Sequence, residues 1–178
     1  NNKKYYIHKT QGLYRSKLIR DSKNIYRYVD KNGVLVKNKW ATYQGKKYYF
    51  DKNGHALKGM KKVGKNYYYF QSKYAYMMRY VRYMNSNDDV YYFGGNGVMV
   101  RNVFYTWSGN NERHTYYFGS NGKMCRSWLT LDGKKYYFDP ETGIMYKNCT
   151  IKIKGKNSTF DANGVYTTVS QASRRVKK

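Results

Sequence analysis

Residues 128–143 read Trp-Leu-Thr-Leu-Asp-Gly-Lys-Lys-Tyr-Tyr-Phe-Asp-Pro-Glu-Thr-Gly, and this stretch decides the fold. Asp132-Gly133 is a tight-turn dipeptide between two runs rich in aromatic and β-branched residues, which is typical of a β-hairpin. A second turn follows the aromatic run, and in related stretches it ends in Asn-Gly, a pair that tolerates positive φ. The place of Asp132-Gly133 is taken elsewhere by Gln44-Gly45, Val63-Gly64 and Lys154-Gly155.

The motif Tyr-Tyr-Phe recurs along the chain. Full copies end at Phe50, Phe70, Phe93, Phe118 and Phe138, and degenerate copies end at Ile7, Val29 and Phe160. Successive ends lie 22, 21, 20, 23, 25, 20 and 22 residues apart. A unit of this size cannot bury an apolar face alone and must stack on its neighbours. The sequence therefore predicts an all-β fold, a β-solenoid of about eight stacked hairpin repeats of roughly 21 residues.

We expect the array to occupy residues 1–168 and to be followed by a disordered basic tail at 169–178, which has no aromatic residue. Because the chain begins inside a repeat, we also expect it to be a piece of a longer parent protein. Two units are irregular: Tyr74 stands where a turn Gly is expected, and the longer steps predict long hairpin turns at 85–89 and 108–114. Inward anchors between hairpins are expected six or seven residues after the turn Gly, at Leu18, Trp40, Met60, Val103, Trp128 and Cys149.

The charge is strongly basic. Thirty-five Lys and Arg face 10 Asp and Glu, which gives a formal net charge of +25. An excess of this size predicts a polyanionic partner or surface. No stretch approaches the roughly 20 apolar residues of a membrane-spanning helix, so we expect no transmembrane segment.

The sequence indicates no catalytic centre. All ten carboxylates fall in expected turns, where a turn role explains them, and His8, His55 and His114 lie in turns of different repeats. Cys125 and Cys149 lack the Cys-x-x-Cys spacing of zinc or redox sites. They are either two small buried residues or a disulfide between adjacent repeats. We therefore expect no catalytic residues, no cofactor and no metal site.

The pattern Trp-x-x-x-(x)-Gly-Lys-x-Tyr-Tyr-Phe-Asp-x-x-Gly resembles the cell-wall-binding repeat of Gram-positive surface proteins, from Lys3 to Val165. That family includes choline-binding modules of murein hydrolases, glucan-binding regions of glucansucrases, and anchoring or aggregation modules of lactic acid bacteria. The resemblance implies a left-handed superhelical β-solenoid and a secreted binding module at the cell surface or cell wall. Choline-binding members cage a quaternary ammonium between two Trp and a further aromatic residue or Met, through cation-π attraction.

This chain departs from the choline-binding pattern. The first Trp is present only at Trp40 and Trp128, and Met99, Met124 and Met145 persist after the turn. We expect most cages to be weakened, because the second Trp is replaced by Tyr48, Tyr68, Tyr91, Tyr116 and Tyr136.

Basic residues keep the phase of the repeat. Four positions after the turn Gly stand Lys37, Lys58, Arg101, Arg126 and Lys147, and Arg15 and Arg79 lie one residue out of this register. Equivalent positions of a solenoid form a row, which could hold a flexible polyanion through many weak contacts. The alternative is that these side chains only keep an edge-rich β-protein soluble. Further candidates for polyanion binding at the hairpin turns are Lys46, Lys47, Lys65, Lys134, Lys135, Lys154 and Lys156.

Aromatic side chains could add sugar stacking. The candidates are Trp40, Trp128, Tyr48, Tyr136, Tyr80 and Tyr83. A mixed aromatic and cationic site is expected at the cluster of Tyr76, Arg79, Tyr80, Arg82 and Tyr83.

The leading hypothesis is a non-catalytic module that anchors a secreted protein or adhesin to the wall through teichoic or lipoteichoic acid, with a role in adhesion or aggregation. The alternatives are a neutral α-glucan (dextran) module and a choline-binding module of a larger enzyme. Basic rows with aromatic residues also suit single-stranded nucleic acid, but an extracellular setting makes a specific nucleic-acid partner the weaker hypothesis.

Overall fold

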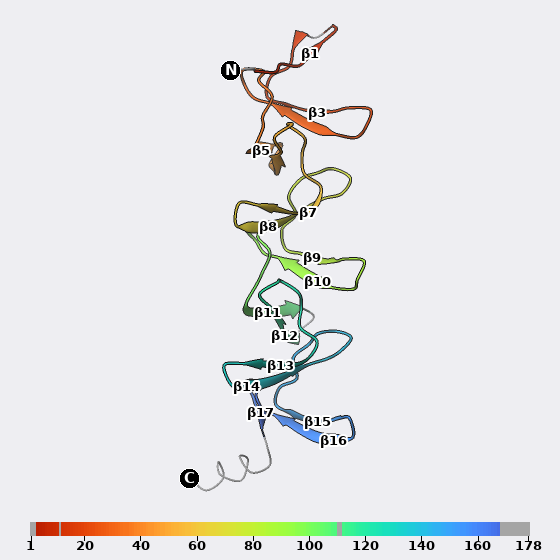
Figure 1. The fold of residues 1–178 in the computed structure, drawn as a ribbon, viewed down its shortest axis with the longest axis vertical. Coiled ribbons are helices and arrows are strands. Elements are labelled where there is room, and N and C mark those ends of the chain that lie inside the picture. Colours follow the sequence, from red (N-terminus) through yellow and green to blue (C-terminus); the bar gives the residue numbers. More distant parts are fainter. Residues whose placement is uncertain (1–2, 11, 110–111, 168–178) are drawn as a thin grey trace. The chain divides into compact units, whose positions relative to one another are not determined.

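The chain folds into β-hairpins. The computed structural model describes residues 3–10, 12–109 and 112–167. Within these ranges the regular elements are β-strands, paired antiparallel in eight separate small sheets (Figure 1). The all-β class and the eight hairpin repeats are thereby confirmed, while the expected tail at 169–178 lies outside the described residues. None of the described segments forms a helix suited to crossing a membrane.

The strands are β1 (Ile7–His8), β2 (Gly12–Leu13), β3 (Lys17–Arg20), β4 (Tyr26–Val29), β5 (Lys39–Tyr43), β6 (Lys46–Phe50), β7 (Gly59–Val63), β8 (Asn66–Phe70), β9 (Val81–Met84), β10 (Val90–Phe93), β11 (Val103–Gly109), β12 (Glu112–Phe118), β13 (Ser127–Leu131), β14 (Lys134–Phe138), β15 (Cys149–Ile153), β16 (Lys156–Phe160) and β17 (Tyr166–Thr167).

The chain divides into two compact units. The first unit comprises Asn1–Tyr83 and Tyr92–Met99, and the second comprises Met84–Tyr91 and Val100–Lys178. Within the first unit the hairpins point in different directions: in Figure 1 the β3–β4 hairpin extends to the right and the β7–β8 hairpin to the left. The second unit repeats this arrangement with β13–β14 and β15–β16.

Hairpin tips follow the local sequence. The register Tyr43↔Lys46 leaves Gln44 and Gly45 as a two-residue loop, and their φ values of 47° and 72° fit a type I′ turn. Asp132-Gly133 and Lys154-Gly155 form the same turn. In β7–β8 the register Val63↔Asn66 puts Gly64 and Lys65 in the loop, so the predicted turn at Val63-Gly64 is one residue off.

In each repeat after the first, one of the most deeply buried residues lies at the end of the second strand. Seven such residues are at most 1% exposed: Val29, Phe50, Phe70, Phe93, Phe118, Phe138 and Phe160. Each forms an isolated bridge or strand pair with a residue beyond the following turn, for example Val29 with Leu35 and Phe50 with Ala56. In the first repeat the equivalent pair is Ile7 with Leu13. We call these partners the anchors, which differ from the inward anchors expected from the sequence; in the first seven repeats they are Leu13, Leu35, Ala56, Met77, Met99, Met124 and Met145.

The anchors link each repeat to the preceding one. The Leu35 N–H donates to the carbonyl of Lys4 at 2.9 Å, and the Met145 N–H donates to the carbonyl of Thr115 at 2.8 Å. The same bond recurs from Ala56 to Tyr26, Met77 to Lys47, Met99 to Tyr67 and Met124 to Val90. From Tyr26 onward, every acceptor lies three residues before the buried residue of its own repeat, whereas Lys4 lies three residues before the exposed Ile7.

Anchor side chains cover the turn glycine of the next repeat. A Cβ added to Gly97 (φ 80°) would lie 2.5 Å from Met77 Sδ, and one added to Gly54 would lie 2.9 Å from the Leu35 side chain. Both φ and space therefore require glycine at these turns.

After Phe70 the place of the turn glycine is taken by Ala75, not by Tyr74 as the sequence predicts. Ala75 has a φ of 63° and is fully buried, and its N–H donates to the Gln71 carbonyl at 2.7 Å. The sequence count fails because this turn is one residue longer than the turn from Asp51 to Gly54.

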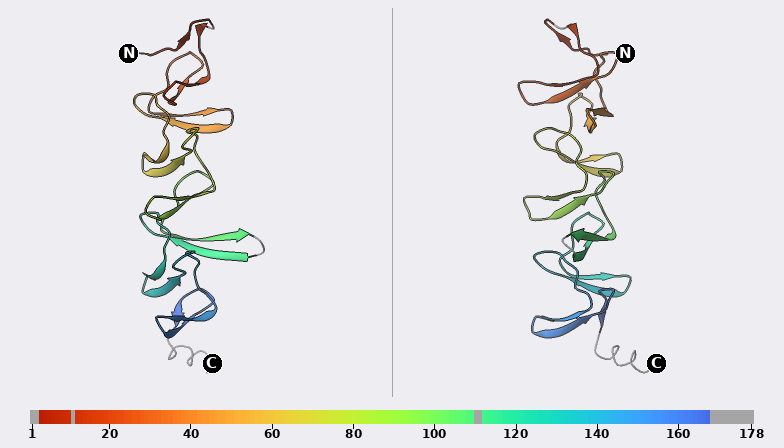
Figure 2. Two further views of the ribbon diagram at one scale, coloured as in Figure 1. Left: turned by 90° about the vertical axis from the view of Figure 1, so that its right-hand side faces the viewer. Right: turned by 180° about the vertical axis from the view of Figure 1, so that it is seen from behind.

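Two further expectations are wrong. The step of 25 residues reflects longer strands rather than a long turn, because β11 and β12 pair from Val103↔Phe118 out to Gly109↔Glu112 (Figure 2). Trp40, Val103 and Trp128 are 38%, 42% and 44% exposed, so they are not inward anchors. Trp40 and Trp128 pair with Tyr49 and Tyr137, so strand alternation places them on the face opposite the buried Phe50 and Phe138. Val103 pairs with Phe118 itself but stays exposed in the first residue pair of its hairpin.

Candidate functional site

Seven basic residues occupy one position of the repeat. Each lies two residues after an anchor and immediately before a residue with positive φ that leads into the next hairpin. We call this set the basic row: Arg15, Lys37, Lys58, Arg79, Arg101, Arg126 and Lys147. Arg15 and Arg79 are therefore in register. The turn before Arg79 is one residue longer than most, and Arg15 follows Leu13 at the spacing at which Lys37 follows Leu35.

Two members of the basic row reach back to the preceding repeat. Lys58 Nζ donates to the Asn24 carbonyl at 3.0 Å and lies 5.6 Å from the centre of the Tyr26 ring. Lys147 Nζ donates to Thr115 Oγ1 at 3.3 Å. The carbonyls of Tyr26 and Thr115 accept the hydrogen bonds from the anchors Ala56 and Met145, so both residues lie at junctions between adjacent repeats. These two side chains of the basic row therefore lie at the same kind of junction.

A first pocket of about 580 Å³ combines row and non-row cations. It is lined by Lys4, Tyr5, Tyr6, Arg27, Leu35, Lys37, Asn53 and His55. Arg27 Nη2 lies 3.0 Å from His55 Nε2, and the Arg27 guanidinium also pairs with Asp21. The hydrogen bond from Arg27 lowers the pKa of Asp21, so this carboxylate stays ionised and offsets one of the three cations.

A second pocket, of about 320 Å³, lies between β6 and the segment after β8. It brings together Lys46, Lys47, Tyr76, Arg79 and Tyr80. Lys46 Nζ lies 4.3 Å from the centre of the Tyr76 ring, and Tyr80 is 69% exposed. The structure thus joins three members of the predicted mixed cluster to two lysines that the sequence places far away.

Arg82 and Tyr83, the other members of that cluster, do not line the second pocket. Tyr83 stacks on Tyr69 with ring centres 4.5 Å apart. Arg82 is exposed on β9.

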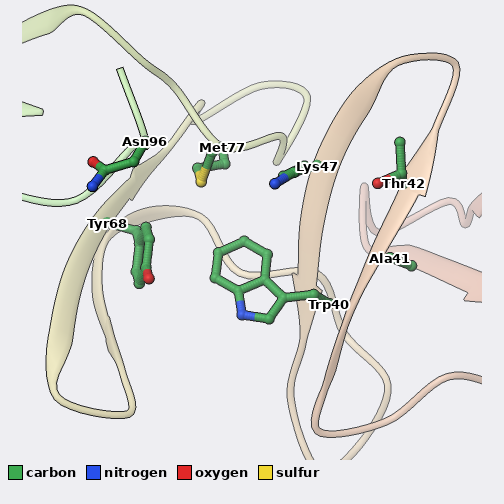
Figure 3. A pocket seen from close by; sticks show the side chains of 7 residues that line it. All are labelled: Trp40, Ala41, Thr42, Lys47, Tyr68, Met77 and Asn96. Atoms are coloured by element: carbon green, nitrogen blue, oxygen red, sulfur yellow. The ribbon is translucent and has the colours of Figure 1, made fainter. Parts of the chain in front are cut away.

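Two pockets contain the exposed tryptophans. The pocket at Trp40 has a volume of about 460 Å³ and is lined by Trp40, Ala41, Thr42, Lys47, Tyr68, Met77 and Asn96 (Figure 3). The pocket at Trp128 has a volume of about 340 Å³ and is lined by Trp128, Thr130, Lys135 and Tyr166. Each combines side chains from at least two repeats, which the sequence alone could not bring together.

Tyr48 and Tyr136 cannot stack on a sugar. They are only 5% and 9% exposed, because each lies two residues before a buried Phe and shares its face of the strand. The prediction of these two as sugar-binding residues is wrong, whereas Trp40, Trp128 and Tyr80 are accessible.

Few cations of the candidate site have a carboxylate partner. Within the described residues, carboxylates contact basic groups at three places: Asp21 with Arg27, Glu112 with His114, and Asp89 with Lys123. Lys123 lies 2.8 Å from Asp89 and lowers the pKa of that carboxyl, an effect to which the charge of Arg126 adds. Lys65, Lys134, Lys154 and Lys156 are exposed at hairpin tips.

The carboxylates of Asp30, Asp51, Asp139 and Asp161 accept bonds from backbone N–H groups of their own turns. Asp51 Oδ1, for example, accepts bonds from Asn53 N and His55 N at 2.8 Å. Over the described part of the chain, no group of three or more His, Cys, Asp and Glu side chains is placed to hold a metal ion.

Cys125 and Cys149 are both free thiols, and both are half-buried. They therefore form no disulfide with each other, and neither is the fully buried residue that the first alternative expected.

Comparison with known proteins finds two matching family models. A choline-binding repeat matches residues 108–149, and a putative cell wall binding repeat matches residues 38–56. Comparison with curated protein sequences finds no match.

Several solved structures are similar. Choline binding protein F from Streptococcus pneumoniae, crystallised in the presence of a peptidoglycan analogue, is 25% identical with a TM-score of 0.67 over 88% of this chain and 47% of that one. The chain thus spans about half the length of that protein. The choline-binding domain of CbpL from S. pneumoniae is 25% identical with a TM-score of 0.68 over 93% of this chain and 83% of that domain. The modular autolysin LytC from S. pneumoniae, 20% identical with a TM-score of 0.54 over 92% and 45% of the two chains, shares the fold.

Proposed function

The chain belongs to the cell-wall-binding repeat family, and from this premise we propose that it anchors its parent protein at the cell surface by electrostatic binding of teichoic or lipoteichoic acid. The module itself acts by binding rather than by catalysis. The parent protein is secreted by a Gram-positive cell and uses the module for attachment, adhesion or aggregation.

The observation that carries the proposal is the phase of the basic row. Seven cations occupy one structural position in seven repeats, each directly before a residue with positive φ. Cations that served only for solubility would not need a constant position. A polymer with regularly spaced phosphates meets such a row with many weak contacts, each helped by its neighbours through effective concentration.

The clustering of like charges supports the same proposal. The second pocket gathers Lys46, Lys47 and Arg79, and none of the residues that line it is acidic. Cations held close together repel one another, and a bound anion relieves that repulsion.

The test is binding to purified lipoteichoic acid, with dextran and a choline-bearing polymer as parallel ligands, at low and high salt. If single-stranded nucleic acid is a guide, log affinity falls by roughly 0.7 per phosphate contact for each unit of log salt. Four contacts would then weaken binding about fiftyfold between about 50 and about 200 mM salt. Binding to dextran that ignores salt would instead support the neutral α-glucan alternative.

Choline recognition is the second candidate, because the Trp40 pocket has the aromatic and methionine walls that hold a quaternary ammonium. Lys47 in the same pocket opposes it by charge repulsion. Free choline that displaces the protein from the wall polymer would favour this candidate.

A further inference from the structure

The pockets at Trp40 and Trp128 arise from one local arrangement that occurs in both units of the chain. Trp40 and Thr42 are two residues apart on β5 and share a face, as do Trp128 and Thr130 on β13. The registers Thr42↔Lys47 and Thr130↔Lys135 bring a lysine opposite each threonine on the same face. One hairpin face therefore presents an exposed indole, a hydroxyl and an ammonium group side by side.

The following repeat closes each pocket with an aromatic ring. Tyr68 meets Trp40 edge to face with ring centres 4.9 Å apart, and Tyr166 meets Trp128 in the same way at 5.3 Å. In Figure 3 the Trp40 ring, Tyr68 and the Lys47 ammonium border one space, with Met77 and Asn96 along its far side. The two indoles keep 38% and 44% of their surface exposed, which leaves ring area for a ligand.

The polar groups of both pockets favour an anion. Within the described residues neither Lys47 nor Lys135 forms an ion pair, and no carboxylate lines either pocket. In the Trp40 pocket the Oδ1 of Asn96 accepts a bond from Val98 N, so this side chain offers a ligand its amide NH₂. A quaternary ammonium would have aromatic walls here but would also meet a lysine of the same charge.

We propose that each of these pockets binds one sugar unit that carries a negative charge, with an apolar face of the sugar ring on the indole and the anionic group on the lysine. The aromatic wall supplies the flat surface, and the lysine supplies a charge-assisted hydrogen bond, which is stronger than a neutral one. Volumes of about 460 and about 340 Å³ lie at the small end of the range for small-molecule sites, about 300 to 1,000 Å³. The ligand class is thus an anionic glycosyl unit, and phosphate and carboxylate share the chemistry that the lysine recognises.

This inference deepens the proposed function and rests on it. The wall polymer that the chain binds would carry charged sugar substituents in addition to its backbone phosphates. The basic row would hold the polymer backbone, and the tryptophan pockets would hold single sugars. The two roles are separable, because a monosaccharide cannot span the junctions between repeats.

The test uses the indole N–H resonances of the full chain, labelled with ¹⁵N, during titration with glucose 6-phosphate, glucuronate, glucose and choline. The chain has three tryptophans, and Trp107, which lies in neither pocket, serves as the internal control. The expected result is that glucose 6-phosphate or glucuronate shifts the Trp40 and Trp128 signals at concentrations about tenfold lower than glucose does, while Trp107 does not move. Equal response to glucose, a response to choline alone, or shifts at all three indoles would overturn the proposal.

Lys47→Ala is the matched variant, because Lys47 is exposed and the Trp128 pocket, which has its own lysine, serves as the reference. The variant should lose the roughly tenfold preference for the anionic sugar at Trp40 and keep it at Trp128. An unchanged preference at Trp40 would reject the lysine as the anion ligand. Lipoteichoic acid binding by the unmodified chain separates the two proposals: a chain that binds anionic sugars but not the polymer would count against the basic row alone.

Discussion

Ala56 and Ala75 together replace, at one junction between adjacent repeats, the large anchor and the turn glycine that pack against each other at other junctions. Ala56 takes the anchor position of Leu35, as its bridge to Phe50 and its bond to the Tyr26 carbonyl show. Ala75 takes the position of Gly54, with a φ of 63° and no exposed surface. At Gly97 an added Cβ would collide with Met77, so a Cβ at the turn is compatible only with a small anchor.

The pair should be energetically coupled. Ala56→Met alone should destabilise the protein by about 1–3 kcal/mol, because the larger side chain would meet the Cβ of Ala75. Ala75→Gly alone removes left-handed strain of about 1–2 kcal/mol but adds backbone entropy to the unfolded chain, so its net effect should be small. In the double variant the penalty of Ala56→Met should largely disappear. Urea unfolding of the four proteins measures the coupling, and equal costs of Ala56→Met in both backgrounds would contradict it.

The basic row should carry polymer binding without carrying the fold. Replacing Lys37, Lys58, Arg101, Arg126 and Lys147 by Ser should leave the circular dichroism spectrum and Tm nearly unchanged but reduce affinity for lipoteichoic acid by at least about tenfold and flatten its salt dependence. A control variant with the same charge loss replaces exposed lysines outside the row: Lys31, Lys39, Lys52, Lys61 and Lys152. If both variants lose affinity equally, net charge rather than the row explains binding.

Asp139 should titrate far into the acid range. Its carboxylate accepts bonds from Thr142 N and from the Tyr146 hydroxyl, the latter at 2.8 Å, and these bonds lower its pKa to about 2. Because the folded pKa lies below the unfolded value, this group stabilises the protein above about pH 4, and its contribution is lost as pH falls toward 2.

Tyr146→Phe removes one of the two strongest bonds to Asp139. The pKa of the carboxyl should rise yet stay below its ordinary value, because the bond from Thr142 N remains. The same bond raises the pKa of Tyr146 to about 12, so the tyrosine contributes stability below pH 10 that is lost as pH rises through 12. A carboxyl NMR titration of Asp139 in both proteins makes the comparison, and an identical midpoint would show that the tyrosine hydroxyl does not act on this carboxylate.

Both cysteines should be free thiols. Alkylation without prior reduction should label Cys125 and Cys149, as read by intact mass. Burial raises the pKa of Cys125, so this thiol should react more slowly at pH 8 than a small-molecule thiol. A protein that takes up no label until it is reduced would contradict the free state.

The repeat period and the turn dipeptides were enough to predict the hairpins and the phase of the basic row. The errors arose where side-chain direction or turn length decides the outcome. Tyr48 looks like a binding aromatic in the sequence, but the alternation of β6 turns it to the same side as Phe50. Arg79 looks out of phase because one extra residue in the turn before it cannot be assigned until Ala75 is seen with positive φ. The pocket at Trp40 combines β5, β6, β8 and the segments around Met77 and Asn96, and no local pattern specifies such a combination.

The backbone link from each anchor ends one repeat back, at residues such as Lys4, Tyr26 and Thr115. Each junction uses the same backbone bond between equivalent positions of two repeats. Duplication or deletion of one whole repeat in the gene therefore leaves the remaining junctions intact. Each added copy brings one more cation of the row and one more weak attachment point. Attachment strength can then be adjusted in evolution by copy number, in discrete steps, while the chemistry of each repeat stays the same.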